Sequence, residues 1–179
     1  QGIKLTYLPF IIRALVIALK DHPYLNASLD EDTEEIVLKH YYNVGVATAT
    51  DRGLMVPVVK GADSMDLFDL ASEITRLSDA ARDGKIALED LQGGTFTITN
   101  VGSLGSLMGT PIINQPQTAI LSPGAIVKRP VVVDDDAIAV RSMVFLALSF
   151  DHRLIDGRGA VRFLVHIKEC IEQPERLFI

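Results

Sequence analysis

The sequence predicts an α/β fold in which helices pack against a mixed β-sheet. Segments with the two-residue period or the short apolar runs of strands outnumber segments with a helical period. Helical segments separate some of these strands, which indicates a mixed sheet covered by helices. No internal repeat or low-complexity segment interrupts the pattern. Since 179 residues suit one domain with a substantial core, we expect residues 1–179 to form a single domain.

The composition argues against several classes of protein. With 48% hydrophobic and 22% charged residues, the chain is typical of a globular protein. A net charge of -6 without a Lys/Arg cluster argues against a nucleic-acid partner. The most apolar segment, residues 5–19, is interrupted by Arg13 and too short to span a bilayer, so we expect no membrane partner. Gln1 begins no signal peptide, and the single Cys170 fits a reducing compartment, the bacterial or archaeal cytoplasm or the mitochondrial matrix.

The first half of the chain predicts one helix followed by short strands. Residues 5–20 are apolar enough for a mostly buried helix, which Thr6 can cap and which His22 and Pro23 end. Short strands are expected at residues 26–29 and 35–40, with an acidic loop between them. Alternation over residues 44–49 predicts a half-buried strand, which leads through a turn at 51–53 into residues 54–60.

The second half predicts a helix, further strands and a final helix. Apolar residues from Leu67 to Leu77 recur at a helical period, with Asp63 and Ser64 as the expected cap and a stop at residues 83–84. Strands are expected after Gly94, at residues 118–121, at 125–133 and at 137–150, the last two joined by an acidic turn. In the strand after Gly94, Phe96 and Ile98 should face one way and Thr97 and Thr99 the other. An amphipathic run at residues 160–172 predicts the last helix.

A histidine lies where a buried strand is expected to end. The continuous apolar run at residues 144–148 is typical of a central strand buried on both faces. It leads into the motif SFDHRLIDG at residues 149–157, which contains His152. Because the ordinary pKa of histidine is about 6.5, both protonation states are accessible near neutral pH, and His152 is a candidate general base. The alternative is a structural histidine paired with Asp151 or Asp156.

This motif, together with GGTFTITN at residues 93–100, resembles the two signatures of the dihydrolipoyl acyltransferases. These enzymes form the catalytic cores of the 2-oxo acid dehydrogenase complexes, and their fold is shared with chloramphenicol acetyltransferase. The resemblance runs from Leu5 to the C-terminus and implies a mixed β-sheet sandwich with packed helices. It also implies that the chain is an acyltransferase catalytic domain that lacks its N-terminal segment, the lipoyl domain and the partner-binding domain.

The resemblance assigns a role to each candidate catalytic residue. His152 would take the proton from a thiol, so that the thiolate attacks the acyl carbon, and the hydroxyl of Thr99 would donate to the resulting oxyanion. Asp156 would hold the geometry of the site by pairing with an arginine; the residues alone also allow Asp156 to cap the following helix.

The glycine-rich loop at residues 102–109 fits neither dinucleotide nor Walker spacing. The resemblance instead makes it a flexible loop along a coenzyme A channel and places Asn100, Ser103 and Gly124 beside the coenzyme. A loop shaped only by its turns is the alternative. His166 and Cys170 lie one helical turn apart, but two ligands make a weak metal site, so we expect a pair facing the core and no metal.

The implied reaction moves an acyl group between coenzyme A and a dihydrolipoyl-lysine carried on a domain outside this chain. A catalytically inert core of the same complex and a free-standing small-molecule acetyltransferase are the alternatives. Residues 105–114 are similar to succinyl-specific relatives, whereas residues 127–132 look more like branched-chain or acetyl enzymes. We favour an acetyl or branched-chain acyl group over succinyl.

The resemblance further implies a homotrimer that assembles into a large cubic or dodecahedral core. The histidine of one subunit would meet the hydroxyl donor of its neighbour, and the 2-oxo acid dehydrogenase and dihydrolipoamide dehydrogenase would bind through the absent domains. The apolar C-terminus, residues 177–179, predicts that Leu177 and Phe178 fill a pocket on a neighbouring trimer. A tail folded onto its own domain is the alternative.

Overall fold

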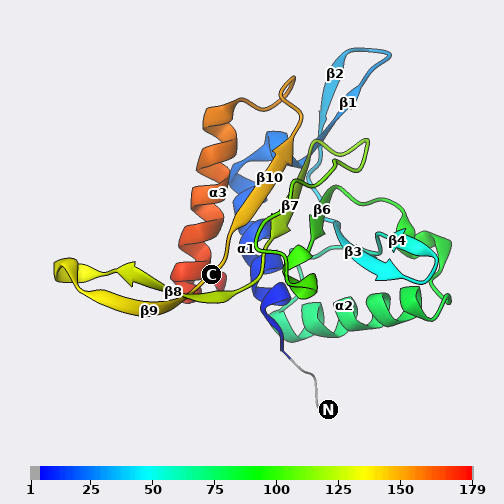
Figure 1. Cartoon of the computed structure of the whole chain (residues 1–179). Helices are drawn as coiled ribbons and strands as arrows, with labels where there is room; N and C mark the ends of the chain where they lie inside the picture. Colours follow the sequence, from blue (N-terminus) through cyan, green and yellow to red (C-terminus); the bar gives the residue numbers. More distant parts are fainter. Residues whose placement is uncertain (1–4, 179) are drawn as a thin grey trace.

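One main sheet, with helices on one of its faces, forms the body of the molecule (Figure 1). The computed structural model describes residues 5–178. The strand order is β10-β7-β6-β3-β4, and β5 also pairs with β3. The β3/β6 and β6/β7 pairs are parallel and the others antiparallel, so the predicted mixed sheet is confirmed. The strands of this sheet are β3 (Val44–Thr50), β4 (Gly53–Met55), β5 (Val58–Val59), β6 (Phe96–Thr99), β7 (Ala119–Pro123) and β10 (Leu146–Phe150).

Three α-helices, five short 3-10 helices and two separate hairpins complete the described chain. The α-helices are α1 (Tyr7–Asp21), α2 (Leu67–Arg82) and α3 (Gly157–Glu172). The 3-10 helices are η1 (Pro23–Asn26), η2 (Leu88–Leu91), η3 (Val101–Leu104), η4 (Asp134–Asp136) and η5 (Pro174–Phe178). The hairpins pair β1 (Ala27–Asp30) with β2 (Glu35–Leu38), and β8 (Val127–Val132) with β9 (Ile138–Met143). Within residues 5–178, no helix is long and apolar enough to cross a membrane.

The core lies between the helices and one face of the sheet. Helix α1 contributes a nearly continuous buried segment, because it packs against both α2 and α3 as well as the sheet. Phe96 and Ile98 of β6 are fully buried in this core. Thr97 and Thr99 alternate with them and line a cavity on the opposite face, as the two-residue period predicts.

Two predicted helix caps were wrong in their detail. Thr6 occupies the position before α1, but its side chain makes no capping hydrogen bond. Helix α2 is capped by Asp66, whose carboxylate accepts the N–H groups of Phe68 and Asp69 at 2.8 Å each. A cap must directly precede the first helical turn to reach its free N–H groups, and Asp63 and Ser64 lie too early in the chain.

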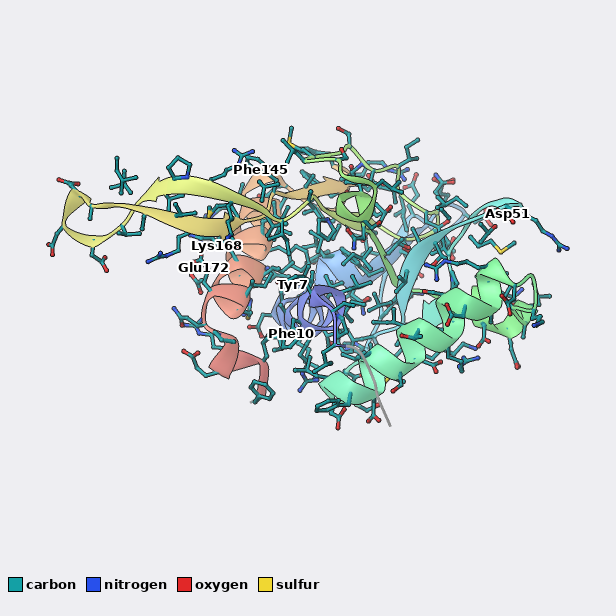
Figure 2. The ribbon with its side chains drawn as sticks, turned by 60° about the horizontal axis from the view of Figure 1, so that its bottom comes forward. Tyr7, Phe10, Asp51, Phe145, Lys168 and Glu172 are labelled. Atoms are coloured by element: carbon teal, nitrogen blue, oxygen red, sulfur yellow. The ribbon has the colours of Figure 1, made fainter. Side chains whose placement is uncertain are left out.

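The predicted strand at residues 137–150 is two strands in two different sheets. The chain leaves the β8–β9 hairpin at Met143 and enters the main sheet at Leu146. Phe145 lies at this junction (Figure 2). Its carbonyl accepts the Gly124 N–H at 2.9 Å, and the centroid of its ring lies 4.8 Å from the guanidinium carbon of Arg129. The hairpin projects away from the body of the molecule (Figure 1).

Strand β10 is an edge strand and not the central strand that its apolar run predicts. All its residues are half-buried: Leu146, Leu148 and Phe150 pack on the core, and Ala147 and Ser149 alternate with them. A short apolar run does not distinguish an edge strand with one covered face from a central strand.

The C-terminal prediction was wrong for Leu177. Its side chain is 2% exposed and packs in the core of its own domain, and its carbonyl accepts the Nε–H of Arg13 at 3.1 Å. The tail therefore folds back onto the domain. Phe178 is 71% exposed, and Ile179 lies outside the described residues.

A histidine pair joins the end of α1 to α3. The ring centroid of His22 lies 5.6 Å from that of Phe163 and 5.8 Å from that of His166, whose Nδ1 is 3.8 Å from an Asp21 carboxylate oxygen. Burial lowers the pKa of His22 below its ordinary value, and the nearby His166 and Arg162 lower it further, while Asp21 opposes them.

The free energy of unfolding should therefore fall as the solution becomes acidic. Because the pKa of His22 is lower in the folded state, the unfolded chain binds more protons once the pH drops below about 6.5. The contribution of neutral His22 to the free energy of unfolding is complete above that pH and is lost as the pH falls through the pKa of His22 in the folded state. Urea unfolding across this range should show a weaker pH dependence for His22→Gln than for the parent, and identical pH dependences would contradict this expectation.

Candidate active site

His152 lies in a tight turn between β10 and α3, as the sequence predicts. The Asp151 N–H donates to the Thr118 carbonyl at 2.8 Å, which ties the start of the turn to the neighbouring strand. The Asp151 carbonyl then accepts the N–H groups of Leu154 and Ile155 at 3.1 and 3.0 Å. The His152 side chain is exposed, and its ring lies 5.6 Å from that of Phe150. A rigid strand and a closed turn thus hold an accessible imidazole.

Asp156 caps α3. Its Oδ1 accepts the N–H of Gly159 at 2.6 Å, at the first turn of the helix. The structure therefore shows the capping role, which does not exclude a pairing of Asp156 with an arginine, and that pairing stays a prediction. Asp151 accepts hydrogen bonds from Arg153, and Asp156 accepts the Gly159 N–H, so the alternative of a structural pair with His152 is not found within the chain.

Removing the cap should destabilise the domain modestly. Asp156→Ala should lower the free energy of unfolding by about 1 kcal/mol, because the first turn of α3 loses an acceptor. Asp156→Asn keeps a capping oxygen and should stay close to the parent. Chemical denaturation of the three proteins measures the difference, and equal stability of the alanine and parent proteins would contradict the assignment.

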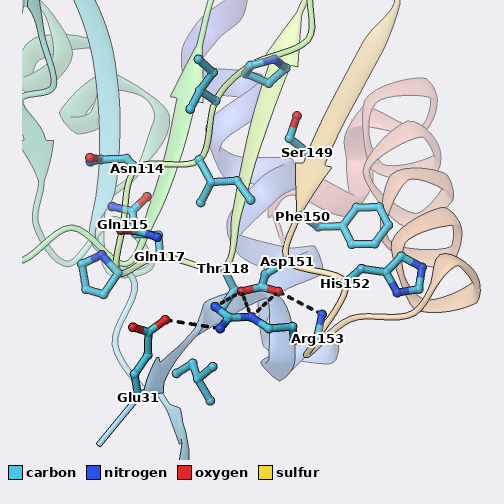
Figure 3. Close-up of a pocket in the computed structure, with 15 residues that line it drawn as sticks. Glu31, Asn114, Gln115, Gln117, Thr118, Ser149, Phe150, Asp151, His152 and Arg153 are labelled. Carbon is cyan, nitrogen blue, oxygen red and sulfur yellow. Dashed lines mark hydrogen bonds and ion pairs between the residues drawn. The ribbon is translucent and has the colours of Figure 1, made fainter.

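An ion-pair network that the sequence did not predict borders the histidine. Arg153 donates to both carboxylate oxygens of Asp151, with contacts of 2.7 to 3.1 Å, and reaches Glu31 of the β1–β2 hairpin at 3.3 Å (Figure 3). Hydrogen bonding from Arg153 lowers the pKa of Asp151, so this acid stays ionised near neutral pH. Because Asp151 and Arg153 are only two positions apart, their ion pair could have been predicted from the sequence. Glu31 is 122 positions away from Arg153, and nothing in the sequence connects them.

A large cleft opens beside this turn. Its volume is about 1040 Å³, and three segments form its walls: the end of β1, the loop before β7 and the turn that carries His152. Figure 3 shows the Arg153 guanidinium facing Glu31 across the cleft, with the His152 ring on the other side of the turn, beside Phe150. The lining residues include Leu29, Pro116, Gln117, Thr118 and Ser149.

Thr99 lies far from His152 within one chain. Thr97 pairs with Ile120 and Ile98 with Leu121, so Thr99 is level with Ser122, which in turn pairs with Ala147. Ala147 precedes His152 by five residues, which at strand spacing is roughly 15 Å along β10. Two strand spacings add roughly 10 Å across the sheet. Thr99 lines a second cavity, of about 390 Å³, which shares only the loop at residues 111–114 with the cleft of His152. One chain therefore does not bring the two predicted catalytic residues together.

The structure does bring Asn100, Ser103 and Gly124 together, in a third cavity of about 260 Å³. Asn100 accepts the Ser103 N–H at 3.2 Å, and the Ser103 hydroxyl donates to the Asn100 carbonyl at 2.8 Å. A Cβ at Gly124 would overlap the carbonyl of Leu107, so the loop at 101–109 packs backbone to backbone against this position. Residues of α1 and of the β9–β10 junction also line the cavity, and the sequence did not indicate them: Tyr7, Leu8, Ile11 and Val144.

The expected core-facing pair on α3 is confirmed for Cys170, which is 1% exposed. Burial raises the pKa of its thiol. His166 contacts His22 and Asp21 at the helix interface. Among residues 5–178, no group of three or more His, Cys, Asp or Glu side chains is arranged to hold a metal ion.

The fold is that of the chloramphenicol acetyltransferase class. A solved chloramphenicol acetyltransferase covers 92% of this chain and 77% of its own with a TM-score of 0.56, at 14% identity, so the likeness is one of fold alone. Residues 1–179 match the family described as 2-oxoacid dehydrogenases acyltransferase (catalytic domain). The chain belongs to this acyltransferase family.

Two curated relatives align with the whole chain. The dihydrolipoyllysine-residue succinyltransferase component of the 2-oxoglutarate dehydrogenase complex of Bartonella vinsonii subsp. berkhoffii is 53% identical over 179 residues, which are 43% of its length. The acetyltransferase component of the pyruvate dehydrogenase complex of Staphylococcus aureus (strain Mu50 / ATCC 700699) is 48% identical over 41% of its length. The chain thus spans about two fifths of these relatives.

Two solved structures superimpose closely, each with a TM-score of 0.95 over 99% of this chain and 73% of theirs. One, 36% identical, is the cubic core of the pyruvate dehydrogenase multienzyme complex. The other, 35% identical, comes from a crystallographic and enzymatic investigation of a serine, a histidine and an asparagine in the mechanism of Azotobacter vinelandii dihydrolipoamide acetyltransferase. That asparagine follows the histidine by four positions, the spacing between His152 and Asp156 here.

Proposed function

We propose that this domain transfers an acyl group between dihydrolipoyl-lysine and coenzyme A, as the core of a 2-oxo acid dehydrogenase complex. The observation that carries the proposal is the accessible imidazole of His152, held by a closed turn at the end of β10 in a chain that matches the acyltransferase family throughout. Its compartment would be the bacterial or archaeal cytoplasm or the mitochondrial matrix, and the lipoyl-lysine would come from a domain outside these 179 residues.

The chemistry needs one base and one oxyanion donor. His152 takes the proton from the attacking thiol, and the thiolate adds to the carbonyl carbon of the thioester. The Thr99 hydroxyl donates a hydrogen bond to the oxyanion of the tetrahedral intermediate. The intermediate then expels the second sulfur as a thiolate, which takes the proton back from the imidazolium. Because both substrates are thiols, the same two groups serve in either direction.

The separation of Thr99 and His152 within one chain supports a site built between chains. In a homotrimer, His152 of one subunit would act with Thr99 of its neighbour, and trimers would then assemble into a hollow core. The solved cubic core, a relative of the same fold, supports assembly of this kind. Asn100, Ser103 and Gly124 would bind coenzyme A in their shared cavity. Phe178 keeps the exposure that a contact between trimers requires.

An assay of the complete domain tests the reaction. Acetyl-coenzyme A and free dihydrolipoamide should yield S-acetyl-dihydrolipoamide and coenzyme A, both quantified after chromatographic separation, because the transfer exchanges one thioester for another and leaves their total unchanged. Assembly without transfer of any acyl group would instead identify an inert core. Acetylation of chloramphenicol in preference to dihydrolipoamide would identify a small-molecule acetyltransferase.

A further inference from the structure

We propose that the cavity beside Thr99 holds the acyl chain of the substrate, and that its uncharged lining selects an apolar acyl group, acetyl or short branched, over a dicarboxylic one. This inference rests on the proposed function and deepens it. Succinyltransferase and acetyltransferase relatives match the chain at similar identity, 53% and 48%, so similarity leaves the acyl group open.

The chemistry of the intermediate places the acyl chain. The oxyanion forms on the carbonyl carbon of the acyl group, and the acyl chain is bonded to that same carbon. If Thr99 donates to the oxyanion, the first carbons of the acyl chain lie within a few ångströms of its hydroxyl. They therefore enter the cavity that Thr99 lines, while the sulfur is directed toward the base.

The lining that one chain contributes to this cavity is uncharged throughout. Aliphatic side chains from β3, β4, β7 and the two connecting loops dominate it, and its volume of about 390 Å³ exceeds that of an acetyl or isobutyryl group. The lining residues are Ala47, Leu54, Val56, Thr97, Thr99, Val101, Gly109, Thr110, Pro111, Ile112, Ile113, Asn114 and Ile120. A carboxylate placed here would find no cation of the same chain to pair with.

The most buried polar side chain of the lining, Thr97, already forms a hydrogen bond within the protein. Thr97 is 1% exposed, and its hydroxyl donates to Gln117 Oε1 at 2.6 Å. That hydroxyl hydrogen is therefore not free to solvate a carboxylate. The wall is also closely packed, because a Cβ at Gly45 would lie 2.8 Å from Val56 Cγ1 and 3.0 Å from Thr97 Oγ1.

Arg153, in the cleft of His152, is a cation near the site, but it is not free to bind a carboxylate of the acyl group. Within one chain, Arg153 lines the cleft of His152 and not the cavity of Thr99, although residues 111–114 line both. In the proposed trimer, the Arg153 that approaches Thr99 belongs to the neighbouring chain and arrives with its His152. Its guanidinium is bound to the carboxylates of Asp151 and Glu31. A succinyl carboxylate would have to compete with both acids for it.

The first test compares acyl donors with the complete, assembled domain. The ratio kcat/KM should be at least about tenfold higher for acetyl- or isobutyryl-coenzyme A than for succinyl-coenzyme A, with dihydrolipoamide as acceptor. A preference for succinyl would overturn the inference and leave the proposed function standing. No transfer from any of the three donors would overturn the proposed function together with the inference.

The second test places a cation in the cavity. Leu54 of β4 is 69% exposed at the edge of the sheet, so Leu54→Arg should fold, and it should raise the succinyl-to-acetyl ratio of kcat/KM by about tenfold. Leu88 is 70% exposed and lines no part of this cavity, so Leu88→Arg is the matched control and should leave the ratio unchanged. An unchanged ratio in Leu54→Arg, or an equal change in both variants, would overturn the placement of the acyl chain.

Discussion

Replacing His152 with alanine should reduce acyl transfer by about 100- to 10,000-fold while leaving the fold intact. The side chain is exposed and takes no part in the backbone hydrogen bonds that close its turn, so its loss leaves β10 and α3 in place. The reaction loses the base that converts a thiol into a thiolate. Turnover of the assembled domain and its thermal unfolding should be measured together.

A second exposed histidine supplies the control. His40 follows β2 and lines none of the three cavities around the site, so His40→Ala should keep the turnover of the parent. Near-normal turnover in a folded His152→Ala protein would remove His152 from the mechanism. Equal losses in the two variants would point to a general effect of histidine replacement on the assembly.

Replacing Thr99 with valine should lower kcat by about 100-fold with little change in KM. Valine keeps the shape of the side chain and removes only the hydroxyl, so the loss falls on the intermediate and not on the bound substrate. Thr99→Ser retains the hydroxyl and should keep most of the activity. A change confined to KM would reassign Thr99 to substrate binding.

Mixing the two inactive variants tests where the site is assembled. If His152 of one chain acts with Thr99 of another, co-refolded His152→Ala and Thr99→Val chains contain some sites with both groups intact. Activity should then reappear in the mixture, at a fraction of the parent value. A mixture as inactive as its components would place both groups in a single chain, against the separation found along β10.

The sequence by itself determined the local structure and the identity of the reactive groups. Alternation along β6 put Phe96 and Thr99 on opposite faces, and the structure has Phe96 in the core and Thr99 at a cavity. The apolar run before residue 149 and the helical period after it located His152 in a turn between strand and helix. Such patterns are readable because they depend on the period of one element and on which of its faces is covered.

Only the tertiary structure decided how these pieces relate to one another. Strand order made β10 an edge strand, and register separated Thr99 from His152. The meeting of Glu31 with Arg153 depends on how a hairpin packs against a distant turn, and the two residues are 122 positions apart. The chemistry of Asp156 allows it to cap a helix, and the position of the Gly159 N–H shows that it does. Contacts of this kind depend on the packing of several elements at once, whereas a local pattern reports only the element that contains it.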